Sequence, residues 1–218
     1  MLFRSKMGQS ITTFRIDRSE GKFGPFAGQL FLGDYSLSLV MRATTELVDG
    51  VWQGACYPFR EGFGNGILAV EFGPGGRLMT GGTNRGWPVR GNRQFVLERL
   101  DWTGVTPFEI ERVTAAKDGF VVRFTLPVDA ATATAPASYA LSSYTHIYHE
   151  GYGSPEVDQT TPRVTRAEVA ADRRSVHLTV DGLVLGHVHE MDLAGIRAEQ
   201  GDALLHTKAY YTLNRIPK

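Results

Sequence analysis

Turn-forming residues interrupt this chain at short intervals, and their spacing most constrains what it can fold into. Gly, Pro or Asp-Gly pairs recur about every 8 to 12 residues. Apolar residues rarely recur at the three- and four-residue spacing of an amphipathic helix. The stretches between the turns are rich in Val, Leu, Phe, Thr and Tyr, which favour strands. The sequence therefore predicts an all-β protein built from short strands.

The first half of the chain predicts two consecutive strand meanders. The second meander turns through Gly-Pro-Gly-Gly, a sequence typical of a hairpin that needs positive φ. It is expected to be one strand short of the first. The strands expected in the first meander are residues 12–17, 29–34, 38–47 and 51–59, and those in the second are 67–72, 77–83 and 94–102.

A change of composition after Asp101-Trp-Thr-Gly predicts a domain boundary near residue 105, dividing the chain into residues 1–105 and 106–218. Seven strands with turn signals over about 110 residues favour an immunoglobulin-like sandwich in the second domain. Those strands are expected at residues 109–113, 120–126, 138–141, 164–169, 175–180, 187–193 and 209–214.

The first domain contains a weak internal repeat, seen by comparing FAGQLFLGDYS with GPGGRLMTGGTNR. Four-stranded units that repeat at roughly 40 to 50 residues are typical of propeller blades. Residues 1–105 therefore predict an incomplete β-propeller of about one and a half blades. Because so few blades cannot close a ring, we expect either partner blades or a longer protein of which this sequence is a truncated piece.

Charge and composition exclude several classes of function. The chain has 23 Lys plus Arg against 23 Asp plus Glu, so no global field favours a nucleic acid or an anionic membrane as the main partner. Its single Cys cannot form an internal disulfide or a Cys-rich zinc site. No apolar run reaches the roughly 18 residues of a membrane span, and no secretory signal follows the first basic residues.

Several motifs resemble a known family. The segments GPFAGQLFLGDYS, GVWQGACYPFREGFGNGI, FGPGGRLMTGGTNRGW and LERLDWTGVTPFEI look like the closing blades of bacterial glucose/sorbosone dehydrogenase-like propellers. The remaining segments, including FVVRFTLPVD and VTRAEVAADRRSVHLTV, look like the sandwich that follows these blades, which is similar to bacterial immunoglobulin-like domains. The match covers residues from about 12 to 217.

The resemblance implies a periplasmic or secreted protein whose missing upstream portion carries a signal and most of the blades. In the quinoprotein relatives, pyrroloquinoline quinone and Ca²⁺ sit over the propeller mouth and a His acts as the base in sugar oxidation. Residues 1–105 contain no His. We therefore carry over no catalytic residue and expect this chain to be inactive alone, with no cofactor of its own.

Propeller topology predicts a ligand site on one rim, because the loops that enter a blade and join its middle strands emerge on the same face. The Arg-rich loop that carries Trp87 would suit an anionic or planar ligand. The alternative is that these residues only tie loop carbonyls and pack between blades. The residues expected at the rim site are Asp34, Arg60, Glu61, Asn65, Asn84, Arg85 and Trp87.

Four other groups of residues could form a functional site, but each also has a structural explanation. Asp34 and Glu61 together are too few oxygen ligands for Ca²⁺. His187 and His189 point to one face of a strand and could bind a metal with His146 or His149, but isolated pairs on β-surfaces are usually structural. The Tyr-rich stretch at 144–156 could stack on sugars or cover a sandwich edge. Ser154 lacks the strand-turn-helix elbow of a hydrolase.

Three functions therefore stay open. The complete protein could be a quinone-dependent sugar or alcohol dehydrogenase, and this chain its C-terminal fragment. It could instead be a non-catalytic module that binds a carbohydrate or a partner protein. In the third alternative, the sandwich is a spacer that covers the last edge of the ring and positions a neighbouring domain.

Overall fold

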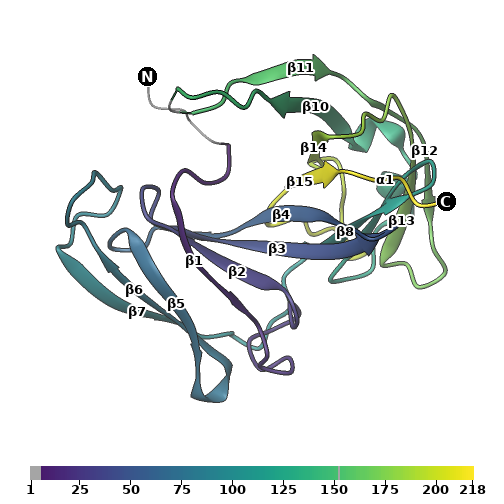
Figure 1. Cartoon of the computed structure of the whole chain (residues 1–218). Coiled ribbons are helices and arrows are strands. Elements are labelled where there is room, and N and C mark those ends of the chain that lie inside the picture. The colour runs from purple at the N-terminus through teal and green to yellow at the C-terminus, as the bar shows by residue number, and fades with distance from the viewer. Residues whose placement is uncertain (1–5, 152) are drawn as a thin grey trace. The chain divides into compact units, whose positions relative to one another are not determined.

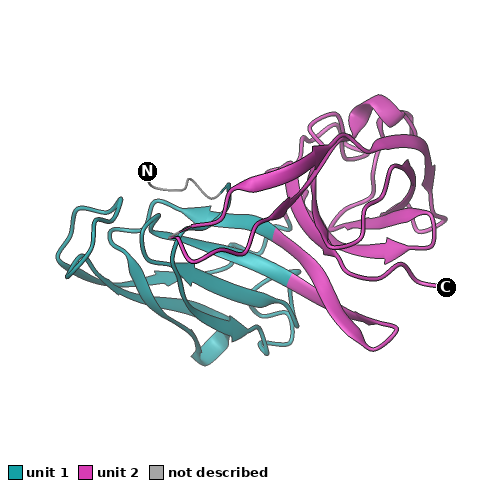
Figure 2. Ribbon diagram, turned by 45° about the horizontal axis from the view of Figure 1, so that its top comes forward, with its two compact units in different colours: residues 1–43, 57–106 teal, residues 44–56, 107–218 magenta. Residues whose placement is uncertain are grey.

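The structure is a computed structural model, and it describes residues 6–151 and 153–218. About 50% of the chain is strand and about 5% is helix, so the protein is all-β, as the turn spacing predicts. No helix in the described part of the chain is long and apolar enough to cross a membrane. The chain divides into two compact units: unit 1 runs to Ala43 and resumes over Tyr57–Thr106, and unit 2 comprises Thr44–Cys56 and Pro107–Lys218 (Figure 2).

Unit 1 contains strands of two antiparallel sheets. In the eight-stranded sheet, β1-β2-β3-β4 come first in the order and continue to β15; the three-stranded sheet has the order β5-β6-β7. Each set is a meander of sequence neighbours (Figure 1). Their bounds are β1 Ile11–Ile16, β2 Leu30–Asp34, β3 Leu39–Val48, β4 Val51–Glu61, β5 Ile67–Gly73, β6 Arg77–Thr83 and β7 Phe95–Leu100, with the 3-10 turn η1 at Pro74–Gly76. The seven strands lie within a few residues of their expected positions.

A phenylalanine-rich core joins the two sheets of unit 1. Phe31 from β2 lies edge-on to Phe59 from β4, with ring centroids 5.0 Å apart, and to Phe72 from β5 at 5.4 Å. Edge-to-face packing of this kind adds about 1 kcal/mol per pair beyond the buried area. The core also contains residues from both sheets, the β1–β2 connection and the β4–β5 loop: Phe23, Phe26, Val40, Phe63, Ile67, Val70 and Leu78.

The hairpin of β3 and β4 belongs to both units. Its base lies in unit 1 and its tip, Thr44–Cys56, lies in unit 2. Asp49 and Gly50 at the tip have φ of 46° and 77°, the positive values that a two-residue hairpin turn requires. Within unit 2, β4 pairs with β15, where Cys56 lies opposite Tyr210.

Unit 2 packs a four-stranded sheet, β12-β13-β9-β8, against strands in the order β15-β14-β10-β11. Phe120 on β9 contacts Tyr211 on β15 and His189 on β14, with ring centroids 5.2 and 5.5 Å apart, so the two layers share one core. The elements are β8 Ile110–Ala116, β9 Gly119–Phe124, α1 Ala130–Ala133, η2 Pro136–Ser138, β10 Ala140–His146, β11 Glu156–Thr160, β12 Arg163–Val169, β13 Ser175–Asp181, β14 His187–Asp192 and β15 Lys208–Leu213. The sequence missed only β11 among these strands.

Candidate functional site

Three connections of unit 1 lie together: the β2–β3 turn, the β4–β5 loop and the β6–β7 loop, which we call the rim loops. The Tyr35 hydroxyl of the first donates a hydrogen bond of 2.9 Å to the carbonyl of Arg85 in the third. The backbone N–H of Arg90 donates to the carbonyl of Ser36 at 3.1 Å. The structure therefore brings together the loops that carry the sequence-predicted rim residues.

Two glycines allow the rim loops to approach one another. A Cβ atom on Gly91 would lie 2.3 Å from the carbonyl oxygen of Gly64, and one on Gly66 would lie 2.6 Å from that of Tyr35. Both distances are far below van der Waals contact, so any side chain there would push the loops apart. The N–H of Arg93 also donates to the Gly64 carbonyl at 3.1 Å.

Asp34 stabilises the β2–β3 turn and ties it to the segment before β1. Its side chain is fully buried. One carboxylate oxygen accepts hydrogen bonds from the N–H groups of Gln9 and Ser10 at 2.6 and 2.7 Å, and the other accepts from Leu37 at 2.8 Å. The carboxylate thus satisfies three backbone donors, which assigns Asp34 to loop positioning rather than to contact with a ligand.

Asn65 has a similar structural role. It is fully buried, its amide nitrogen donates to the carbonyl of Arg93, and its amide oxygen accepts from the N–H of Gly66 at 2.7 Å. The side chain therefore ties the β4–β5 loop to the β6–β7 loop, and both of its polar ends are engaged.

The other five predicted rim residues, Arg60, Glu61, Asn84, Arg85 and Trp87, are exposed. The indole of Trp87 is 76% exposed. It lines an open hollow of about 510 Å³ together with Asn84, Gly86, Pro88, Val89 and Gly91. An exposed aromatic face beside an amide can stack on a flat ligand and hydrogen-bond to its polar edge. Arg85 precedes Gly86 in the same loop and is exposed, but it is not part of the lining.

The sequence did not single out some residues that shape this hollow. Pro88 and Val89 contribute apolar lining, and neither belongs to a residue type that signals a site. The carboxylate of Glu98 on β7 accepts the N–H of Gly64 at 3.0 Å and so supports the β4–β5 loop from below. An isolated Glu in an alternating strand gives no sequence signal of this contact.

A larger groove of about 890 Å³ lies elsewhere in unit 1, along β1, β5 and the turn that follows β1. Its lining includes Arg15, Arg18 and Lys22 as well as Glu20 and Glu71. Arg15 and Glu71 form an ion pair of 2.7 Å across it. Because the charges are mixed and two of them neutralise each other, the groove defines no ligand class.

The histidines of unit 2 do not converge. His187 and His189 both point into the core from β14, where His187 Nδ1 lies 3.0 Å from the Ser143 hydroxyl. His146, at the end of β10, and His149, in the following loop, are exposed. Within the described residues, no group of three or more His, Cys, Asp or Glu side chains is placed to hold a metal ion.

Burial gives His189 an unusual protonation behaviour. The side chain is fully buried against the Phe120 ring, and this burial lowers the pKa of the imidazole from 6.5 to about 4. The ring is therefore neutral at pH 7, which suits a core position.

A buried carboxylate and a histidine meet in unit 2 without any sequence signal. Glu109 is 2% exposed, and its carboxylate lies 2.5 Å from Nδ1 of His206, whose backbone N–H also donates to it at 3.3 Å. The two residues are 97 positions apart. Their pairing holds the segment before β15 to the segment before β8.

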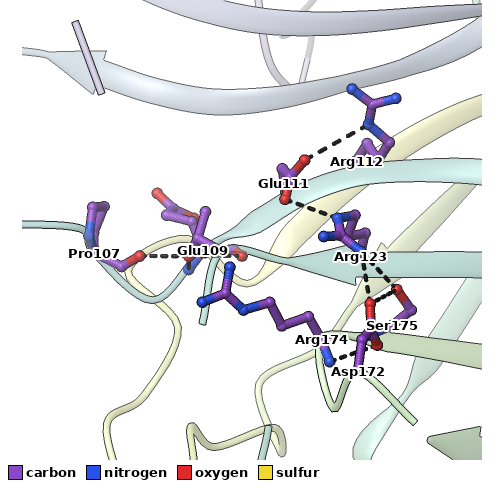
Figure 3. A network of polar contacts seen from close by, with 9 residues as sticks. Pro107, Glu109, Glu111, Arg112, Arg123, Asp172, Arg174 and Ser175 are labelled. Atoms are coloured by element: carbon purple, nitrogen blue, oxygen red, sulfur yellow. Dashed lines mark hydrogen bonds and ion pairs between the residues drawn. The ribbon is translucent and has the colours of Figure 1, made fainter. Parts of the chain in front are cut away.

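A network of polar contacts around Arg123 stabilises the C-terminal end of β9 (Figure 3). Arg123 lies between the carboxylates of Glu111 and Asp172, at 3.2 and 2.8 Å, and donates to the Ser175 hydroxyl at 3.2 Å. Hydrogen bonds from backbone N–H groups, first that of Arg174, lower the pKa of the Asp172 carboxyl. Arg123 on β9 thus joins Glu111 on β8 to Asp172 in the turn before β13, so the network is structural.

No protein-family model, curated protein or solved structure matches this chain. Any inference about the function of this chain therefore depends on the geometry of the rim loops.

Proposed function

We propose that this chain is the C-terminal part of a periplasmic or secreted propeller protein of the glucose/sorbosone dehydrogenase-like type, followed by an immunoglobulin-like domain. The order of its two meanders, four strands and then three, supports this proposal. So does the shared aromatic core between the two sheets. The remaining blades or an upstream domain would be its partners in the complete protein.

In this proposal the chain is a non-catalytic binding module whose ligand is a carbohydrate with an anionic group. The observation that carries the proposal is the hollow beside Trp87, whose indole is 76% exposed. A sugar ring would stack on the indole face while Asn84 and Arg85 bind its hydroxyl and carboxylate groups. Asn65 would hold the β6–β7 loop, which lines the hollow, through its hydrogen bond to the carbonyl of Arg93.

The test is a titration of the full chain with an oligogalacturonate and with its neutral methyl ester, followed by calorimetry. We expect binding of the acidic sugar, loss of at least about tenfold in affinity for Trp87→Ala, and a smaller loss for Arg85→Ala. Trp52→Ala is the matched control, because Trp52 is also an exposed indole, at 66%, but belongs to unit 2. Equal affinity for the Trp87 and Trp52 variants would overturn the proposal.

The residues present do not fit the cofactors that the resemblance implies. Both carboxylate oxygens of Asp34 accept backbone N–H groups. Glu61 is exposed and lies 3.8 Å from Arg90, and residues 1–105 contain no His to act as a base. We therefore assign neither Ca²⁺ nor pyrroloquinoline quinone to this chain, and we expect any oxidoreductase chemistry to require the complete protein.

That expectation is tested by dye reduction. The chain is incubated with pyrroloquinoline quinone, Ca²⁺ and a panel of aldoses and alcohols, and reduction of the dye is followed. We expect no turnover above the rate with the chain omitted. Turnover that depends on the chain would exclude the non-catalytic role.

A further inference from the structure

The second strands of the two sheets in unit 1 repeat one short sequence. It is GQLFLG over residues 28–33, which leads into β2, and GRLMTG over residues 76–81, which leads into β6. The first glycine of each copy has positive φ, 81° for Gly28 and 76° for Gly76. The sequence and the turn are therefore repeated together. The equivalent residues are Phe31 with Met79 and Gly33 with Gly81.

One face of the first sheet is covered by the second sheet. Val40 on β3 lies opposite Gly33 on β2, and Phe31 and Val40 are 0% and 1% exposed. A Cβ atom on Gly33 would lie 2.6 Å from Cγ2 of Ile67 on β5. The glycine therefore lets β5 pack directly on this face.

The equivalent face of the second sheet is open. Leu97 on β7 lies opposite Gly81 and is 76% exposed, and Met79 is half-buried. A Cβ atom on Gly81 would make only an ordinary contact of 3.8 Å, with Ala69 of its own sheet. Met79, Gly81 and Leu97, which we call the second-sheet face, thus match the covered face in chemistry but not in burial.

The strand that does the covering also has an equivalent. β5 contacts the first sheet through Ile67, Val70 and Phe72. β1 and β5 each pair with the next strand through a register shift, which begins at Ile11 on β1 and at Ile67 on β5. Aligning the two shifts pairs the residues of β1 and β5 as follows: Ile11 with Ile67, Phe14 with Val70, and Ile16 with Phe72.

The apolar residues of β1 are exposed where those of β5 are buried. Ile11, Phe14 and Ile16, which we call the β1 face, are 50%, 55% and 41% exposed. Ile67 and Val70 are each 1% exposed. Exposed apolar groups gathered on one face mark an interaction surface. The chain therefore presents both halves of an interface that it also contains in buried form.

We propose that copies of this chain associate head to tail, with the β1 face of one copy packed on the second-sheet face of the next. Ile11 and Phe14 of one copy would then lie over Gly81 of the other, as Ile67 and Val70 lie over Gly33 within unit 1. A second copy is the occupant that these observations favour, because the chain itself carries the complementary surface.

The proposed interface joins two different surfaces, so each copy can bind two neighbours. Such an arrangement closes into a ring or continues as an open filament. It uses no charge pair, since Arg99, which lies opposite Met79, is already ion-paired with Asp101 at 2.8 Å.

The two faces do not include the lining of the Trp87 hollow. The inference therefore does not depend on the ligand proposed there, and sugar binding and self-association can fail separately. Within the proposed function, it names a second copy of the chain as the partner that supplies further blades.

The first test is sedimentation velocity of the full chain over a range of concentrations. We expect species that grow beyond a dimer as the concentration rises. Leu97→Lys and Phe14→Lys should each weaken association at least about tenfold, because each places a charge in an apolar contact. Leu205→Lys is the matched control, because Leu205 is an exposed leucine, at 65%, of unit 2. Circular dichroism and thermal unfolding establish that each variant is folded.

Mixing the two variants tests the head-to-tail arrangement. The Leu97→Lys chain keeps its β1 face and the Phe14→Lys chain keeps its second-sheet face, so together they can form one intact interface. An equimolar mixture should therefore form a dimer that does not grow further. A wild-type chain that stays monomeric at all concentrations or stops at a dimer, or a mixture that does not associate, would overturn the proposal.

Gly81→Ala tests the close packing without adding a charge. At concentrations where the chain is monomeric, its thermal unfolding should be unchanged, because the added Cβ atom meets only Ala69 at 3.8 Å. Association should weaken at least about tenfold, because the equivalent atom on Gly33 would lie 2.6 Å from Ile67. Association as strong as that of the wild type would contradict packing of β1 on this glycine.

Discussion

The carboxylate of Glu46 accepts a hydrogen bond from the phenol of Tyr211, 165 positions later in the chain. The same carboxylate oxygen accepts the backbone N–H of Ala115 at 2.8 Å. Burial, and then the Glu46 carboxylate, raise the pKa of the Tyr211 hydroxyl, so it stays a donor. One side chain at the β3–β4 hairpin tip thus joins β8 and β15 within unit 2.

We expect Tyr211→Phe to lower the free energy of unfolding by about 1.5 to 3 kcal/mol, the usual cost of losing a hydrogen bond to a charged group. Urea denaturation measures the change. Tyr148→Phe is the control: Tyr148 is fully exposed, so this substitution should leave the free energy of unfolding unchanged. A Tyr211 variant as stable as the Tyr148 variant would show that Ala115 alone satisfies Glu46.

The buried imidazole of His189 should make stability depend on pH. Its folded pKa of about 4 lies below the unfolded value of 6.5, so the unfolded chain binds the proton more readily. The corresponding stability is fully present above pH 6.5 and is lost as the pH falls toward 4, by about 3 kcal/mol in total.

Urea denaturation between pH 4 and 7.5 tests this expectation. His189→Leu should flatten the dependence over this range, whatever its effect at pH 7.5. Val188→Ala, on the same strand, keeps the imidazole and should keep the slope. An unchanged slope in the His189 variant would assign the dependence to other groups.

Glycine 91 should be essential to the rim loops. Gly91→Ala would place a Cβ atom 2.3 Å from the Gly64 carbonyl oxygen, and the resulting shift should cost about 1 to 3 kcal/mol. It should also lower the affinity of the chain for any ligand that binds beside Trp87. Gly81→Ala is the control, because its nearest contact would be an ordinary 3.8 Å; thermal unfolding of the two variants should differ clearly.

Two histidine–carboxylate pairs in unit 2 should differ in their contribution to stability. Glu109→Gln alters a carboxylate that is 2% exposed and should cost about 1 to 3 kcal/mol. The pair of His177 and Asp118 has side chains 36% and 49% exposed, so His177→Gln should cost less than about 1 kcal/mol. Equal losses in the free energy of unfolding, measured by urea denaturation, would mean that the burial of Glu109 does not make its pair more stabilising than the exposed one.

Local patterns in the sequence were sufficient to place the strands of unit 1. The expected strand at 77–83 coincides with β6, because a Gly-rich turn precedes it and marks where it begins. The Asp-Gly pair likewise marks the β3–β4 turn. Such signals depend on residues that are neighbours in sequence, and alternation and turn chemistry report them directly.

Contacts between distant segments had no such signal. The pairing of Cys56 with Tyr210 puts the tip of the first meander into unit 2, which a division into residues 1–105 and 106–218 does not describe. The sequence also grouped Asp34 with exposed rim residues, because a loop aspartate looks the same whether it faces solvent or accepts three backbone donors. Strand β11 was missed because Glu156–Thr160 is mostly polar.

The shared hairpin also limits how the protein can be dissected. A polypeptide ended at Thr106 would keep Thr44–Cys56 but lose the strand that pairs with it, and the complementary piece would lack the strand beside β15. Neither half would contain all of its own sheet. A gene fusion, a proteolytic fragment or an evolutionary recombination that separates the two units must therefore keep the hairpin with each of them.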